Sequence, residues 1–187
     1  MAMTTTTEAL DRRGIRDAGH LPLTECLVSM GPVLHRLDYG GRVAAVGCQP
    51  PEATALLAAA YPLATLDAVD ADVAAVRAAA RSLGRSPARA RCEIDVGGPA
   101  DLPHDAYDLI CFLRGIGGQV DPVAGARDAL RALRPTGALM VVEHSRCDSF
   151  VDGPVVVGGW LLAAGAARVR VAAATAHGFV LDARAAD

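Results

Sequence analysis

Several of the polar residues that could carry out chemistry in this chain end or follow short apolar runs. Asp70 ends one such run and lies 23 residues after Gly47, which ends another. An acid about 20 residues after a strand-ending glycine binds ribose hydroxyls in nucleoside-binding α/β domains. Asp is also a common N-cap residue of helices. From spacing alone, the two interpretations of Asp70 are about equally supported.

Other polar residues follow or close the later apolar runs. Arg114 can bind an anionic substrate, or it can pair with a neighbouring acid at the surface. His144 can act as a base, although a surface or helix-capping role is the commoner one for a single histidine. Gln49 and Gln119 are neutral hydrogen-bonding residues that can line a pocket. We therefore treat His144 and Arg114 as candidate catalytic residues.

The composition argues against several classes of protein. The 187 residues fit one domain, and a net charge of −3 leaves no basic surface for nucleic acid. No apolar run reaches the roughly 18 residues that a membrane span needs. All 18 basic residues are arginine, which excludes lysine chemistry such as a Schiff base. We expect a small-molecule substrate, and neither nucleic acid nor a membrane as partner.

The cysteines and histidines do not predict a metal site. Five cysteines and five histidines are scattered, and no CxxC pair occurs. The first residues, Met1–Glu8, lack the apolar core of a secretory signal. We expect reduced, buried cysteines in a cytoplasmic protein.

Apolar runs alternate with helical patterns along most of the chain, which predicts a helix-covered, mostly parallel sheet in one domain. A flexible arm is expected over 1–20 and the domain over 21–187. The expected strands are 42–47, 65–70, 90–96, 107–113 and 138–143, followed by an antiparallel pair near 168–172 and 178–183. The expected helices are 21–37, 50–61, 71–83 (stopped by Gly84), 121–133 and 155–165, with a turn at 134–137.

Ligands bind such sheets outside the carboxyl ends of the strands. The candidate residues therefore lie on four loops, at 47–51, 70–72, 95–99 and 113–119.

Four segments, in order, resemble class I S-adenosylmethionine-dependent methyltransferases over about residues 21–185. They are Val43–Pro51 at the Gly-rich first motif, Thr65–Asp70 at the second strand with its terminal ribose-binding acid, Tyr107–Ile110 at the "YDLV" strand, and Ala129–Glu143 at "vLkPGG-lllvE" with Thr136 in place of the first Gly. The resemblance implies a Rossmann-like, doubly wound, seven-stranded α/β sheet with a C-terminal antiparallel hairpin. It also implies S-adenosylmethionine as cofactor.

Carried over residue by residue, the resemblance assigns cofactor binding to six positions, listed here: Gly47, Cys48, Gln49, Asp70, Asp95 and Val96. The acid expected after the third strand is Asp95 if the following loop carries an insertion, and otherwise its position is Gly98. The first motif departs from the family pattern: Ala45 replaces its acid, and Gln49 and Pro51 replace two glycines.

Three functions follow. The favoured one is S-adenosylmethionine-dependent methyl transfer to a small molecule, such as a specialised metabolite. The first alternative is non-methylating chemistry such as cyclisation or isomerisation, and the second is a non-catalytic partner subunit that no longer binds the cofactor. The short segment 145–157 leaves little to cover the site, so a homodimer or a partner subunit is expected to close the open cleft.

Overall fold

Seven strands form one sheet in the computed structural model, which describes residues 30–49, 51–84, 86–144, 153–175 and 178–185. The strands are β1 (Arg42–Val46), β2 (Thr65–Asp70), β3 (Cys92–Val96), β4 (Tyr107–Phe112), β5 (Leu133–His144), β6 (Ala166–Thr175) and β7 (Gly178–Ala185). Their order is β3-β2-β1-β4-β5-β7-β6. The first five run parallel, and β7 is antiparallel to both β5 and β6. This confirms the predicted sheet and its C-terminal hairpin.

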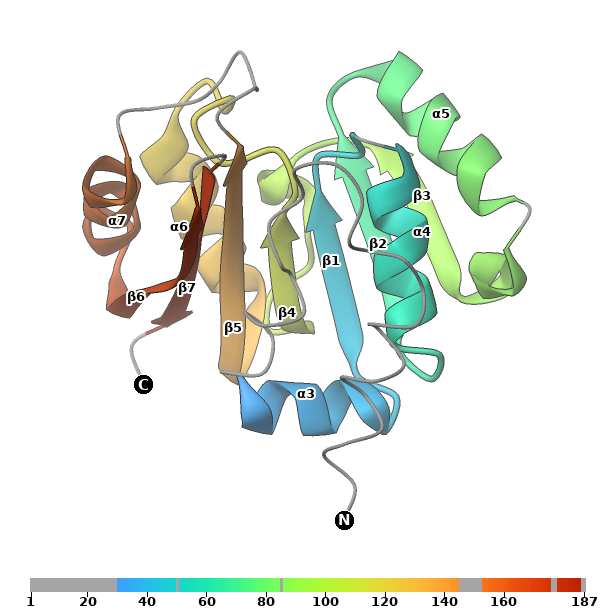
Figure 1. Cartoon of the computed structure of the whole chain (residues 1–187), viewed down its shortest axis with the longest axis horizontal. Helices are drawn as coiled ribbons and strands as arrows, with labels where there is room; N and C mark the ends of the chain where they lie inside the picture. The colour runs from blue at the N-terminus through green and yellow to red at the C-terminus, as the bar shows by residue number, and fades with distance from the viewer. Residues whose placement is uncertain (1–29, 50, 85, 145–152, 176–177, 186–187) are drawn as a thin grey trace.

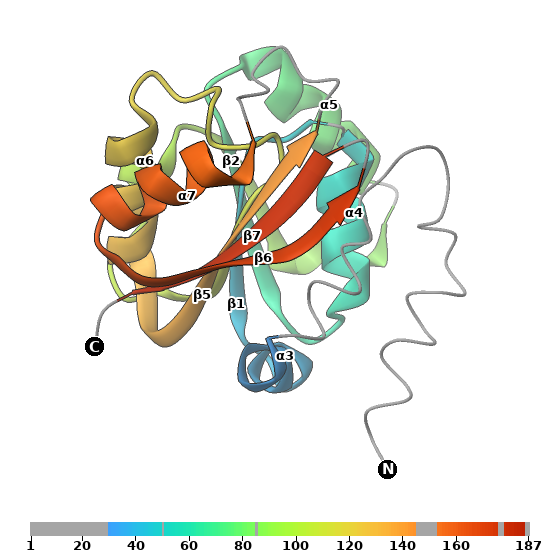
Figure 2. The ribbon, with the colours of Figure 1, turned by 60° about the vertical axis from the view of Figure 1, so that its left-hand side comes forward.

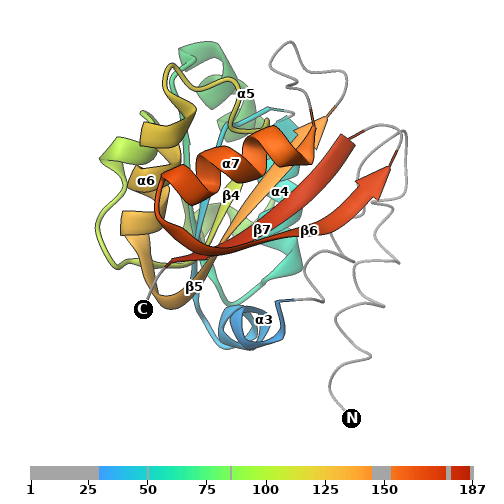
Figure 3. The same cartoon turned by 90° about the vertical axis from the view of Figure 1, so that its left-hand side faces the viewer.

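Helices cover both faces of this sheet (Figure 1). They are α3 (Gly31–Asp38), α4 (Pro51–Ala60), α5 (Val73–Leu83), α6 (Pro122–Ala132) and α7 (Pro154–Ala163), with short 3-10 turns η1 (Pro87–Arg91) and η2 (Pro99–Asp101). α4 lies on one face, and α6 and α7 lie on the other (Figure 2). α7 packs along the β6–β7 hairpin (Figure 3). None of the described helices is long and apolar enough to cross a membrane.

The strands build a core on each face because successive side chains point in opposite directions. Ala45 and Cys111 belong to the core beneath α4, whereas Ala44 and Phe112 belong to the core beneath α6. All four side chains are fully buried. Burial on both faces explains why these strands have continuous apolar sequences.

The predicted turn at 134–137 is wrong. β5 already begins at Leu133, which pairs with Tyr107, and the next pairing joins Ala138 to Leu109. Thr136 between them has a φ of 65°. The Pro-Thr-Gly segment therefore forms an irregularity within a strand, and the chain does not reverse there.

Two helices begin at least two residues later than predicted. The helix expected over 71–83 begins at Val73, and Asp72 caps it by accepting a hydrogen bond from the Ala74 N–H at 2.8 Å. Gly84 ends this helix as expected, but with a φ of −57° it does not use the left-handed freedom of glycine. The expected helix 21–37 corresponds to α3 only from Gly31 onward. Its earlier part and the expected arm 1–20 lie outside the described residues.

A buried carboxylate holds together the end of the sheet where the parallel strands begin. Asp108, whose side chain is 2% exposed, pairs with Arg36 and Arg134, each at 2.8 Å. It also accepts a hydrogen bond from the Arg42 N–H at 3.0 Å. These contacts join α3, β1, β4 and β5 at one point, and Figure 1 shows α3 lying across this end of the sheet.

We predict that Asp108→Ala lowers the free energy of unfolding by about 2–4 kcal/mol, because it leaves a backbone N–H and two guanidinium groups without their acceptor. Urea denaturation would measure the loss. Asp128→Ala is the matched control, since Asp128 forms only a surface pair with Arg131 at 3.5 Å and should cost less than about 1 kcal/mol. Equal losses in the two variants would contradict the role of Asp108.

Candidate functional site

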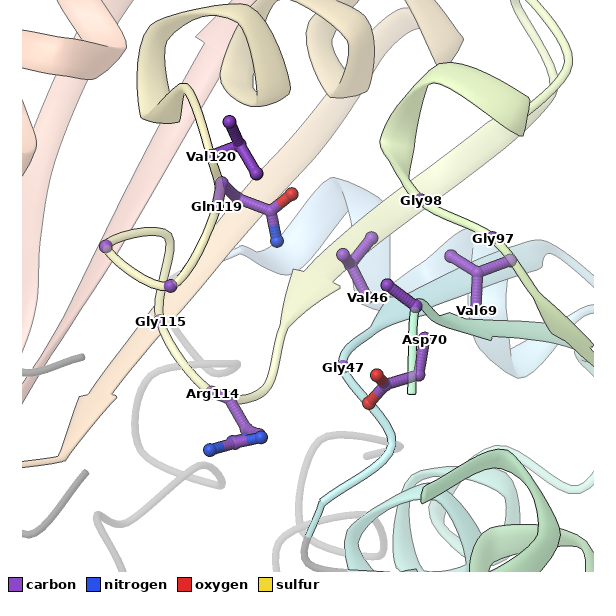
Figure 4. Close-up of a pocket in the computed structure, with 13 residues that line it drawn as sticks. Val46, Gly47, Val69, Asp70, Gly97, Gly98, Arg114, Gly115, Gln119 and Val120 are labelled. Atoms are coloured by element: carbon purple, nitrogen blue, oxygen red, sulfur yellow. The ribbon is translucent and has the colours of Figure 1, made fainter. Parts of the chain in front are cut away.

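A cleft of about 460 Å³ opens at the carboxyl ends of β1, β2 and β4 (Figure 4). It lies where the sequence predicted a ligand, and its volume is in the range of small-molecule sites. The thirteen lining residues are Val46, Gly47, Val69, Asp70, Ala71, Gly97, Gly98, Arg114, Gly115, Gly117, Gly118, Gln119 and Val120. We call Asp70, Ala71, Gly97 and Gly98 the β2 wall, and residues 114–120 the β4 wall.

Asp70 lies at the end of β2 and connects it to the end of β1. One carboxylate oxygen accepts a hydrogen bond from the Cys48 N–H at 2.7 Å, and the other accepts one from the Asp72 N–H at 2.8 Å. The helix-cap interpretation of Asp70 is wrong, because Asp72 caps α5. Each oxygen of an ionised carboxylate can accept more than one hydrogen bond, so Asp70 can still bind hydroxyl groups in the cleft.

The loop after β1 contributes backbone to the cleft. Gly47 lines it with a φ of 87°, a conformation that favours glycine. Cys48 is buried, and this burial, together with the charge of Asp70, raises the pKa of its thiol to about 12. Cys48 therefore acts here through its N–H and not as a nucleophile. Gln49, half-buried, is not among the residues that line the cleft.

The loop after β3 places glycines, and not an acid, at the cleft. Gly97 and Gly98 line it, whereas Asp95 and Val96 are exposed and lie outside the lining. The sequence left two positions, Asp95 and Gly98, open for the acid expected after the third strand. Of these two, Gly98 lines the cleft. The Gly98 N–H donates to Asp101 at 2.8 Å, which holds this loop in place.

The β4 wall carries the other two polar side chains of the lining, Arg114 and Gln119. Gln119 packs against Gly125 of α6, and Figure 4 shows its amide directed into the cleft. Arg114 lies beside Gly47, whose added Cβ would be 3.5 Å from the Arg114 Cβ. The backbone of His144 pairs with Gly178 at the end of β5, but its side chain lies outside the described part of the chain.

Glu143 is a site residue that sequence analysis missed. It is fully buried at the end of β5, and one of its oxygens accepts a hydrogen bond from the Ile116 N–H at 2.8 Å. The carboxylate lies directly against Gly115, whose φ is 75°. Burial raises the pKa of the Glu143 carboxyl, while the backbone amides of Ile116 and Gly117 oppose that rise.

The second feature that was missed is the glycine content of the cleft. Six of its thirteen lining residues are glycines, contributed by the loops after β1, β3 and β4. The pairs at 97–98 and 117–118 are the sequence signal that could have identified them. Glycine lets a ligand approach the backbone closely. A cleft of this kind, with one carboxylate on its β2 wall, suits a nucleoside whose sugar hydroxyls face Asp70.

Solved structures with a similar fold include the DszA carbon methyltransferase, at a TM-score of 0.67 and 14% identity over 86% of this chain and 53% of that one. The mitomycin 7-O-methyltransferase MmcR has a TM-score of 0.59 and 15% identity, over 84% of this chain and 54% of that one. The 4+2 cyclase SpnF has a TM-score of 0.62 and 19% identity, over 90% of this chain and 72% of that one. The chain thus spans about half the length of the two methyltransferases. No protein-family model matches the sequence, and neither does any curated protein.

We predict that Gly115→Ala destabilises the protein by about 3 kcal/mol or more. Its Cβ would lie 2.1 Å from a Glu143 carboxylate oxygen, and its φ is unfavourable for alanine. Gly165→Ala is the matched control, because Gly165 has a φ of 106° but no atom within 4 Å of an added Cβ. The loss of unfolding free energy in this control measures the cost of a positive φ for alanine alone, about 1 kcal/mol. Equal losses in thermal or urea unfolding would contradict the close packing of Glu143 on Gly115.

Proposed function

The chain has the fold of the class I S-adenosylmethionine-dependent methyltransferases, and on this premise we propose that its cleft binds S-adenosylmethionine and directs methyl transfer to a small molecule. The observation that carries the proposal is the position of Asp70. Its carboxylate ends β2 at the cleft and is oriented by the N–H groups of Cys48 and Asp72.

The β2 wall supports a nucleoside in a defined orientation. With the ribose hydroxyls on Asp70, the base would lie along Gly97 and Gly98, which have no side chains of their own. The group attached at the 5′ carbon would then extend toward the β4 wall. Arg114 at the rim of that wall is a cation suited to the carboxylate of a methionine moiety.

The lining offers Asp70 to the ribose and Arg114 to the methionine carboxylate, but two acids of the family pattern are missing: the position at the cleft after β3 is Gly98, and the position in β1 is Ala45. The strand position at which the family has an acid is Ala45, fully buried in the core beneath α4. It supplies neither charge nor hydrogen bond to an ammonium group. Binding would therefore rest on Asp70, on Arg114 and on close approach to the glycine backbone.

Methyl transfer is an in-line displacement whose rate depends mainly on proximity and orientation. When bound, S-adenosylmethionine would supply the electrophilic methyl group. The ionisable side chains among the described lining residues are Asp70 and Arg114. The site therefore suits a nucleophile that needs no strong protein base, and it leaves the substrate to be positioned by the β4 wall.

A second candidate is non-methylating chemistry, such as cyclisation, in the same cleft. Two observations favour it: Gln49 and Pro51 stand where the family has glycines, and a cyclase is among the similar folds. The two functions differ in their products. Methyl transfer converts S-adenosylmethionine to S-adenosylhomocysteine in proportion to product, whereas a cyclase leaves any bound cofactor unchanged.

We predict that S-adenosylmethionine and S-adenosylhomocysteine bind with micromolar affinity in calorimetric titration, and that Asp70→Ala weakens both about a hundredfold. Two charged hydrogen bonds to the ribose are worth this much. Asp95→Ala should bind like the unaltered protein, because the Asp95 carboxylate is exposed and outside the lining. Circular dichroism would verify that each variant is folded. Absence of binding by the folded, unaltered protein would refute the proposal.

We further predict that Arg114→Gln weakens S-adenosylhomocysteine about tenfold and leaves 5′-methylthioadenosine unaffected. 5′-Methylthioadenosine keeps the nucleoside but has no carboxylate. The difference between the two ligands therefore measures the ion pair between Arg114 and the ligand carboxylate. Arg127→Gln, at an exposed position of α6, is the control for loss of positive charge. An equal loss for both ligands would show that Arg114 acts on the cleft as a whole.

A further inference from the structure

No cationic side chain of the described residues lies among the groups that shift the pKa of the buried Glu143 carboxyl, so nothing described would balance its charge when it is ionised. The side chain is fully buried, and its Oε2 has no hydrogen-bond partner. Burial and the amides of Ile116 and Gly117 are what shift its pKa, and no cationic side chain is among these causes. An ionised carboxylate without a paired cation is costly in a buried position, so a cationic ligand group nearby would stabilise its charged form.

Its structural role does not need the charge. The bond that Glu143 makes to the β4 wall is to the Ile116 N–H, at 2.8 Å. A glutamine of nearly the same shape would accept that hydrogen bond through its amide oxygen without placing an ion in the core. The unpartnered oxygen of this acid is thus not used by the packing, and a cationic group of a ligand in the cleft is a partner that would make use of its charge.

The position of Glu143 indicates where that partner would be. The Gly115 backbone lines the cleft, and the Glu143 carboxylate lies immediately behind it, 2.1 Å from where a Cβ on Gly115 would be. The Glu143 carboxyl therefore lies next to the backbone of a residue that lines the cleft, without lining the cleft itself. In a water-poor interior, a charge acts over such distances more strongly than it does in solvent.

We propose that Glu143 is the electrostatic counter-charge of the cleft, selecting a ligand with a positive charge next to the β4 wall. This inference rests on the proposed function: with ribose at Asp70, the group at the 5′ carbon lies along that wall. That group is a sulfonium in S-adenosylmethionine and a neutral thioether in S-adenosylhomocysteine. Glu143 therefore favours the methyl donor over the demethylated product, although it touches neither.

The test is the ratio of the two affinities, measured by calorimetry at pH 8. We expect Glu143→Gln to weaken S-adenosylmethionine roughly tenfold and to leave S-adenosylhomocysteine within about twofold, because only the sulfonium charge differs between the ligands. Glu143→Asp keeps the charge and should keep most of the preference. Glu93→Gln, at an exposed position of β3, controls for the change in net charge.

A purely structural role for Glu143 would change both affinities equally, and an unchanged ratio in Glu143→Gln would overturn the inference. Should the glutamine variant fail to fold, loss of the preference in Glu143→Asp would overturn it as well. These outcomes leave the proposed function standing, since the unaltered protein still binds S-adenosylhomocysteine. Failure of the unaltered protein to bind either ligand refutes the proposed function and this inference together.

Discussion

The hydrogen bond from the Cys48 N–H to Asp70, at 2.7 Å, is the contact on which the cleft depends. It connects the loop after β1 to the end of β2. In the described part of this loop, Cys48 donates to Asp70 and Gly47 has a φ of 87°, while Gln49 and Pro51 stand where similar sequences have glycines. Under the proposed function the same carboxylate binds a ribose, which would couple the shape of the loop to ligand binding.

Two buried acids, Asp108 and Glu143, lie at opposite ends of the parallel sheet. Asp108 sits where the strands begin and is surrounded by arginines from α3 and β5, as a structural acid should be. Glu143 sits where the strands end, with a backbone amide as its hydrogen-bond donor. The difference in their surroundings, and not in their burial, distinguishes Asp108, which joins several elements, from Glu143, for which we propose an effect on the cleft.

Much of the fold could be predicted from the sequence, because strands buried on both faces give continuous apolar runs and the intervening helices are periodic. The position of Asp70 at the cleft followed from the same pattern. Glu143 could not be found this way, since its contact with Gly115 joins the end of β5 to the loop after β4, and α6 separates these two segments in the sequence. The strand through 134–137 was missed because Pro-Thr-Gly is typical of turns. In the structure these residues form an irregularity in the pairing of β5 with β4.

The most direct measurement is a crystal structure of the protein grown with S-adenosylhomocysteine. The ribose hydroxyls should lie within hydrogen-bond distance of the Asp70 carboxylate, with the base along Gly97 and Gly98 and the homocysteine along the β4 wall. A nucleoside bound elsewhere, or an unliganded cleft in crystals grown at saturating ligand, would contradict the account.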